Sequence, residues 1–147
     1  MAVVYADITL INAADVVMAE RHMIGEEEIK QMTVRMLVDS GAYMMSINRS
    51  VQEQMNFGFI ERRKVRLADE TVREFDVVGP ITVKFKNRTA GCNALVLEDE
   101  SECLLGAIPL EELDVLIHPL RQELIVNPDH PYGAVLKMKR AAKTVIA

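Results

Sequence analysis

Short stretches with strand character recur along most of the chain, and this pattern limits the fold more than any other feature. They are rich in Val, Ile, Leu and Thr, and several alternate apolar with polar residues, as half-buried strands do. Turn-forming pairs lie at 69–70 and 87–88, and Gly79-Pro80 breaks or bends a further run. The expected strands cover residues 3–12, 32–39, 64–68, 71–79, 81–86, 92–97 and 123–127.

Only two stretches are expected to be helical. Residues 48–56 offer Asn48 or Ser50 as a capping residue, and Glu53 lies three positions after Ser50, as in a capping box. Residues 108–117 place Pro109 in a first turn and repeat leucines on one face. The 147 residues fit one domain with its own core and show no internal repeat. The pattern therefore predicts an all-β, barrel-like domain with one or two short helices.

Composition narrows the partners and the setting. The net charge of −5 disfavours nucleic acid as a partner, and the basic segment 137–143 is interpreted as a solvated end. No apolar run approaches the roughly 18 residues that span a membrane, and no basic segment precedes the first apolar stretch as in a secretory signal. Cys92 and Cys103 are too few for a disulfide framework. We expect free thiols and a reducing, cytoplasmic setting.

A metal or another cofactor is not expected. His22, His118 and His130 are scattered along the chain and form no metal-ligand spacing, so a metal enzyme is the weakest alternative. His118 and His130 each precede a proline and are expected in loops. Met44 and Met45 are interpreted as core or cleft-wall residues.

The chemistry of the chain is expected at LVDSGA, residues 37–42. An apolar strand ends there in an acid, Asp39, which the turn-forming residues Ser40 and Gly41 follow. An Asp-[Ser/Thr]-Gly triplet occurs by chance in roughly one chain in fifteen of this length, so the triplet alone is a weak signal. An ordinary turn at a strand end is the alternative. The apolar strand before it favours a carboxylate delivered to an apolar edge.

A second element supports this interpretation. In CLLGAIPLEELDVLI, residues 103–117, an apolar strand ends at Gly106 and a short helix follows. A glycine at this position allows another backbone segment to pass closely, although a plain strand-to-helix turn would read the same way.

The order of these parts resembles the retropepsin-like aspartic proteases, and in particular the compact bacterial single-domain members of that clan. LVDSGA at 37–42, VRLADETVREFDVVGPITVKF at 65–85 and LLGAIPLEELDVLIHPLRQELIVNP at 104–128 carry the resemblance, which extends to about Pro131. It implies a protease domain over 1–131 with an acid-protease barrel. Ser40 stands where Thr is commoner, and the hairpin tip lacks the glycine often found there.

The resemblance implies an aspartic endopeptidase that hydrolyses peptide bonds. Such chemistry needs two carboxylates that share one proton around a water molecule. This chain has a single Asp-Ser-Gly, so the second Asp39 is expected from another copy in a homodimer. The remaining residues, 132–147, form a tail in which 134–139 is expected to be a strand at the dimer interface.

The resemblance also assigns roles around Asp39. Ser40 would hydrogen-bond across the dimer axis, while Gly41 and Ala42 would leave room for the substrate backbone. The hairpin tip at Ala68, Asp69 and Glu70 would be the flap that closes over a peptide substrate. Leu104, Leu105 and Gly106 would pack behind the catalytic loop. The alternative is a catalytically silent dimer of the same fold that binds peptides or acts as a scaffold.

Overall fold

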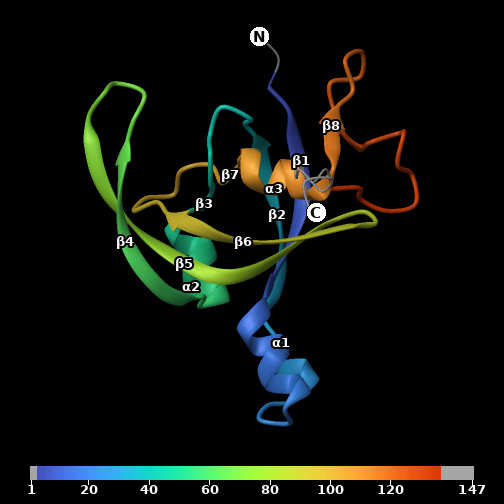
Figure 1. Ribbon diagram of the computed structural model, residues 1–147. Helices are drawn as coiled ribbons and strands as arrows, with labels where there is room; N and C mark the ends of the chain where they lie inside the picture. The colour runs from blue at the N-terminus through green and yellow to red at the C-terminus, as the bar shows by residue number, and fades with distance from the viewer. Residues whose placement is uncertain (1–2, 137–147) are drawn as a thin grey trace, which may run out of the picture.

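The main feature of the architecture is a seven-stranded sheet that folds back on itself, shown in Figure 1 as a computed structural model that describes residues 3–136. Seven strands follow in the order β1-β2-β7-β3-β6-β5-β4, and β1 also pairs with β5, which closes most of the sheet into a barrel. The all-β class with few short helices is therefore confirmed. The strands are β1 (Tyr5–Asn12), β2 (Gln31–Val38), β3 (Met45–Ile47), β4 (Gly58–Arg66), β5 (Val72–Phe85), β6 (Arg88–Val96) and β7 (Leu104–Leu105).

Several strand boundaries differ from those expected. β5 is one continuous strand where two were predicted. The Gly79–Pro80 peptide, which is cis, lies within it, and the register against β6 shifts between Val78 and Ile81. β4 begins at Gly58, well before the predicted start, and β3 was missed because it spans three residues. The turn between β5 and β6 lies at 86–87, so Arg88 is a strand residue.

The helices are α1 (Ala13–Glu20), the short 3-10 helix η1 (Glu26–Glu28), α2 (Arg49–Met55) and α3 (Ala107–Leu113). The predictions of α2 and α3 are confirmed, and Asn48 caps α2 by accepting the Val51 N–H at 2.9 Å. The expectation of only two helical stretches is wrong, since α1 follows β1 directly. The end of the predicted helix over 108–117 is a strand, β8 (Val115–Ile117), which pairs with β9 (Leu124–Val126) because α3 ends at Asp114 with a left-handed φ of 57°.

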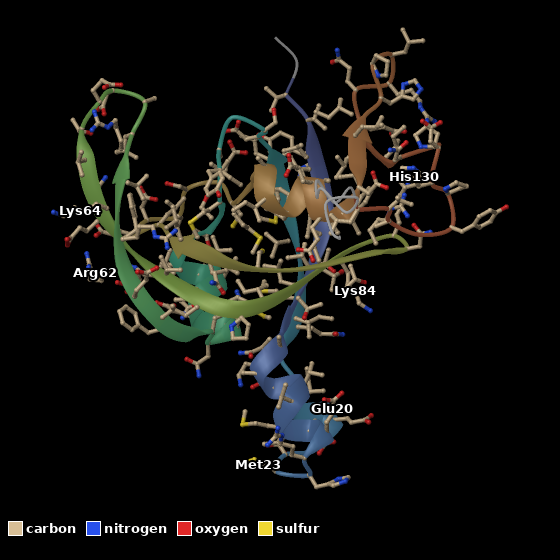
Figure 2. All side chains as sticks on the ribbon, in the orientation of Figure 1. Glu20, Met23, Arg62, Lys64, Lys84 and His130 are labelled. Carbon is tan, nitrogen blue, oxygen red and sulfur yellow. The ribbon has the colours of Figure 1, made fainter. Side chains whose placement is uncertain are left out.

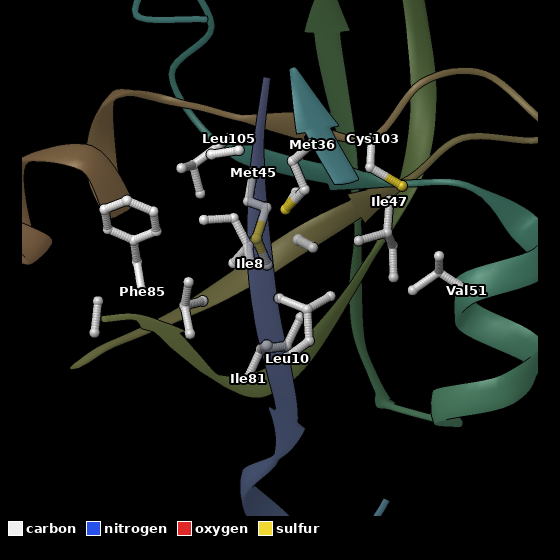
Figure 3. Close-up of a cluster of buried hydrophobic side chains, with 14 of the residues drawn as sticks. Ile8, Leu10, Met36, Met45, Ile47, Val51, Ile81, Phe85, Cys103 and Leu105 are labelled. Carbon is white, nitrogen blue, oxygen red and sulfur yellow. The ribbon is translucent and has the colours of Figure 1, made fainter. Parts of the chain in front are cut away.

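The core lies inside the barrel and draws on nearly every strand. Ile8 and Leu10 of β1 point inward at alternate positions, as the period of a strand requires, and both are fully buried. Each such side chain contributes about 1.5–3 kcal/mol through burial. Figure 3 shows them among the buried side chains of the neighbouring strands and α2, including Met36, Met45, Ile47, Val51, Ile81, Phe85 and Leu105.

Two segments of the chain lie outside this barrel. α1 and the segment after it project from one end of the molecule, with Glu20 and Met23 near the tip (Figure 2). At the other end of the chain, residues 134–136 form no strand, although the Val135 N–H donates to Asp114 Oδ2 at 3.0 Å. The rest of the predicted strand over 134–139 lies outside the described residues. Across residues 3–136 we find no helix with the length and apolarity to cross a membrane.

Candidate active site

Backbone hydrogen bonds on both sides of Asp39 fix its position. Asp39 directly follows β2, and its N–H donates to Leu105 O at 3.0 Å because β2 runs parallel to β7. Its Oδ1 accepts the Gly41 N–H at 2.9 Å, while its carbonyl accepts the Ala42 N–H at 3.1 Å. These bonds form a tight turn that orients the carboxylate. Asp39 is half-buried, whereas Ser40 and Gly41 are exposed.

Gly106 lets the segment after β7 pass directly behind this loop. A Cβ at Gly106 would lie 2.5 Å from Met44 O and 2.7 Å from Ala42 O, so any larger residue would collide with backbone. The next residue donates its N–H to Ala42 O at 2.7 Å, and the Ile108 N–H donates to Tyr43 O at 3.1 Å. The structure thus brings Leu104, Leu105 and Gly106 against the Asp39 loop.

A cleft of about 580 Å³ opens in front of Asp39. The Asp39 loop forms one wall and the hairpin of β4 and β5 forms the other, while Leu95, Leu97 and Leu104 supply apolar lining. Asp39 is the one carboxylate among the described residues that line this cleft. A second hollow of about 300 Å³ lies beside it, lined by Tyr43, Met44, Met45, Arg63, Gly91, Cys92, Asn93, Ile108 and Pro109.

The predicted flap tip is a hydrogen-bonded turn between β4 and β5. Asp69 Oδ1 accepts both the hydroxyl and the N–H of Thr71, and the hydroxyl is the main cause that lowers the pKa of Asp69. Glu70 has a left-handed φ of 70°, at a position where glycine would be favoured. Of the three predicted tip residues, Ala68 lines the cleft, while Asp69 and Glu70 lie exposed at the turn.

Sequence reasoning missed Arg63, Tyr43 and Phe75 as cleft residues. β4 is exposed along almost its whole length, so no alternation marks which of its residues face the cleft. Cys92 is no candidate nucleophile, since burial, with a smaller effect of Glu112, raises the pKa of its thiol to about 12.

Comparison with known families bears on this geometry. A model of the aspartyl protease family matches residues 25–107, more than half of the chain, including the Asp39 loop, the hairpin and β7. The chain belongs to the aspartyl protease family. The same fold occurs in the crystal structure of the retroviral protease-like domain of Ddi1 from Leishmania major, with a TM-score of 0.56 and 18% identity over 87% of this chain and 90% of that chain. The fold of this aspartyl protease family member is thus retropepsin-like.

A weaker structural similarity is to the protein Lpg0085, of unknown function, from Legionella pneumophila subsp. pneumophila str. Philadelphia 1. Its TM-score is 0.38 at 14% identity, over 78% of this chain and 91% of that chain. A search of curated proteins gave no match.

The aspartyl protease chain carries an apolar surface beside the Asp39 loop. We call it the β8 surface and define it by Leu116, Ile117 and Leu120, which are 38%, 41% and 87% exposed. A hollow of about 230 Å³ joins Leu116 and Ile117 to Val38 and Ser40, so this surface is continuous with the loop.

His118 and His130 lie in loops and make local hydrogen bonds. His118 Nδ1 accepts the N–H groups of Leu120 and Arg121, and His130 Nδ1 lies 2.6 Å from Asp114 Oδ2. The Val135 N–H and the side chain of Asn127, with a smaller contribution from His130, lower the pKa of Asp114 to about 2. Within residues 3–136, no group of three His, Cys, Asp or Glu side chains is placed to hold a metal ion.

Proposed function

We propose that the protein is an aspartic endopeptidase that cleaves peptide bonds with a water molecule activated by two Asp39 carboxylates, one from each copy of a homodimer. One observation carries the proposal. Asp39 is anchored through its backbone to Leu105 and through its side chain to the Gly41 N–H, and within residues 3–136 it is the one carboxylate that lines a cleft of about 580 Å³.

Two carboxylates are required because the reaction moves two protons. The deprotonated Asp39 takes a proton from the water as the water oxygen attacks the scissile carbonyl. The protonated Asp39 donates its proton to the carbonyl oxygen, which becomes a hydroxyl of the tetrahedral intermediate. Collapse of that intermediate breaks the C–N bond and passes a proton to the leaving amine. Two adjacent carboxylates share one proton readily, since like charges at short distance oppose double ionisation.

The position of the β8 surface supports the proposal that a second copy of the chain completes the site. A two-fold axis that brings two Asp39 loops together also brings each Ser40 close to its symmetry mate. Ile117 and Leu116 adjoin Ser40 through the shared hollow, so the same operation would bury their exposed area. Apolar area of this kind is what the centre of a homodimer interface contains.

The hairpin supports an extended peptide as the substrate. Within residues 3–136, β4 pairs only with β5 and is the edge strand of the sheet. Its residues 63–66 line the cleft, so a peptide could pair with the edge while its scissile bond lies near Asp39. The turn at 68–70 would then close over the peptide as a flap.

Asp39→Asn tests the proposal. Removing the acid–base group should reduce hydrolysis of fluorogenic peptide pools by about 10²–10⁴-fold, and a pepstatin-type inhibitor should block the unmodified protein. Asp7→Asn is the matched control, because Asp7 is an exposed residue on β1 and should have no effect. Circular dichroism checks that both variants fold. Peptide binding with no Asp39-dependent cleavage would favour the silent, peptide-binding dimer instead.

A further inference from the structure

Arg63 is the cation of β4 whose guanidinium reaches across to the Asp39 side of the cleft. Successive side chains of a strand point to opposite faces. Figure 2 shows Arg62 and Lys64 projecting to the same side of β4, although Lys64 also lines part of the cleft. Arg63 points the other way, and its Nη1 lies 3.6 Å from Met44 Sδ, just beyond the Asp39 loop.

This contact places Arg63 between two hollows. It lines both the cleft of about 580 Å³ and the adjacent hollow of about 300 Å³. The smaller hollow offers apolar walls from Met45, Ile108 and Pro109. A side chain that enters it would therefore meet apolar surface along its stem and a positive charge at its rim.

The guanidinium retains capacity to bind a carboxylate. Nη2 donates to Glu61 Oε2 at 2.7 Å, while the one acceptor of Nη1 among residues 3–136 is a thioether, which is a weak acceptor. The side chains of Arg63 and Glu61 are 48% and 45% exposed, so their ion pair is of the weak, solvent-screened kind that another carboxylate can replace. Once a peptide excludes water from the cleft, a charge-assisted bond to Arg63 becomes stronger.

We infer that Arg63 is a specificity-determining residue that selects peptides with an acidic side chain, in particular glutamate, at the position seated in the smaller hollow. The methylene groups of glutamate would pack on Ile108 and Pro109, and its carboxylate would bind Nη1 of Arg63. This inference rests on the proposed function, because it assumes that the cleft binds peptides. The competing explanation is that Arg63 is one of several charges that keep an edge strand from pairing with other chains.

The test separates binding from catalysis by using the Asp39→Asn protein. The probes are arrays of decapeptides that differ only in a central Glu or Gln, in otherwise randomised sequences. Binding should favour Glu over Gln by about tenfold, as expected for one charge-assisted hydrogen bond. Arg63→Gln should abolish this preference, and Arg63→Glu should reverse it.

Two further variants distinguish selection from edge protection. Arg62→Gln is the matched control, since Arg62 bonds to Asp76 at 2.9 Å on the adjacent strand and does not line the cleft. It should leave the Glu preference unchanged. Glu61→Gln removes the internal competitor of the peptide carboxylate and should raise the Glu preference severalfold, which a purely protective role would not do.

The outcomes of the two proposals are separable. Asp39-dependent cleavage by the unmodified protein with equal binding of Glu and Gln peptides would overturn the inference and leave the protease standing. A Glu preference that depends on Arg63, without cleavage, would support the inference and overturn the protease. If neither pool binds to the Asp39→Asn protein, the inference falls, and cleavage alone decides the proposed function.

Discussion

The α1 end of the molecule and the edge of the barrel that carries the Asp39 loop differ in how far their polar groups are buried and hydrogen-bonded. At the α1 end, Asn12 is 4% exposed and Asp15 is 5% exposed, yet both are bonded within the chain. Asn12 Oδ1 accepts the Asp15 N–H at 3.2 Å, and its Nδ2 donates to Met55 O at 3.0 Å. Asp15 Oδ2 accepts the Lys30 N–H at 3.0 Å. The buried polar side chains at the α1 end therefore have hydrogen-bond partners within one chain.

The edge that carries the Asp39 loop is more exposed. Ser40 and Gly41 are exposed at the loop, and the β8 surface places its apolar side chains next to them. Exposure alone does not separate the two ends, since Val17 and Met23 of the α1 end are also exposed, at 46% and 69%. The difference, among residues 3–136, is that the edge with the Asp39 loop combines an exposed apolar surface with a carboxylate that lines a cleft. Their coincidence supports a second copy there.

The largest effect on dimerisation is expected from Ile117→Glu, a substitution in the β8 surface. In the proposed dimer the new carboxylate would be buried without a partner, which costs about 3–5 kcal/mol for each of two symmetry-related sites. The variant should therefore sediment as a monomer at micromolar concentration and lose Asp39-dependent cleavage. The fold of the monomer should persist, because Ile117 is already 41% exposed in one chain.

Val17→Glu is the matched control for that prediction. Val17 is exposed to a similar extent, 46%, but lies on α1, away from the loop. The mass in solution and the activity of the Val17→Glu variant should equal those of the unmodified protein. If Ile117→Glu stays dimeric and active, the interface lies elsewhere and the β8 surface has another role.

Asn12→Ala should lower the free energy of unfolding by acting at the α1 end. The substitution removes the cap of α1 and leaves the buried Met55 carbonyl without its donor from Asn12. A lost cap costs about 1 kcal/mol, and an unsatisfied buried group costs a further 1–3 kcal/mol, so we expect a loss of about 2–4 kcal/mol in the free energy of unfolding.

Urea denaturation at fixed protein concentration measures this loss, and the fixed concentration is needed because association would itself add stability. Asn87→Ala is the control, since it removes one exposed bond to Pro131 O and should cost well under half as much. The folded fraction of Asn12→Ala should still sediment like the unmodified protein. A change in its mass would mean that the two ends are coupled.

The same contrast explains what the sequence predicts and what it does not. Strand alternation, the Asp39 loop and Gly106 are local patterns, and the all-β class and the turn after Asp39 could be predicted from them. The polar anchor at Asn12 depends on Met55, which is 43 positions away, so no local pattern marks it. Asn12 was accordingly assigned only to a strand, and the helix that it caps was missed.

Residues of the cleft wall and of the β8 surface were also missed for physical reasons. β8 continues the apolar pattern of α3, and only its pairing with β9, set by Asp114 in a left-handed conformation, converts it to a strand. Arg63 stands in a run of charged residues that reads as a solvated surface, and it becomes a cleft residue only because the hairpin folds back towards Met44.

Ser40→Ala should have the smallest effect and gives the sharpest test of where the axis lies. Ser40 is exposed in one chain, so loss of its hydroxyl should leave the fold and the unfolding free energy of the monomer unchanged. If the hydroxyl bonds across the axis, each bond contributes about 0.5–1.5 kcal/mol net, and two-fold symmetry counts it twice. The dissociation constant of the dimer should rise accordingly when measured by analytical ultracentrifugation, with activity falling only at low protein concentration. Ser40→Thr keeps the hydroxyl and should retain most of the affinity, which separates the bond from the side-chain volume. A dissociation constant that is equal for all three proteins would place the hydroxyl away from the axis and leave the β8 surface as the part that holds the dimer together.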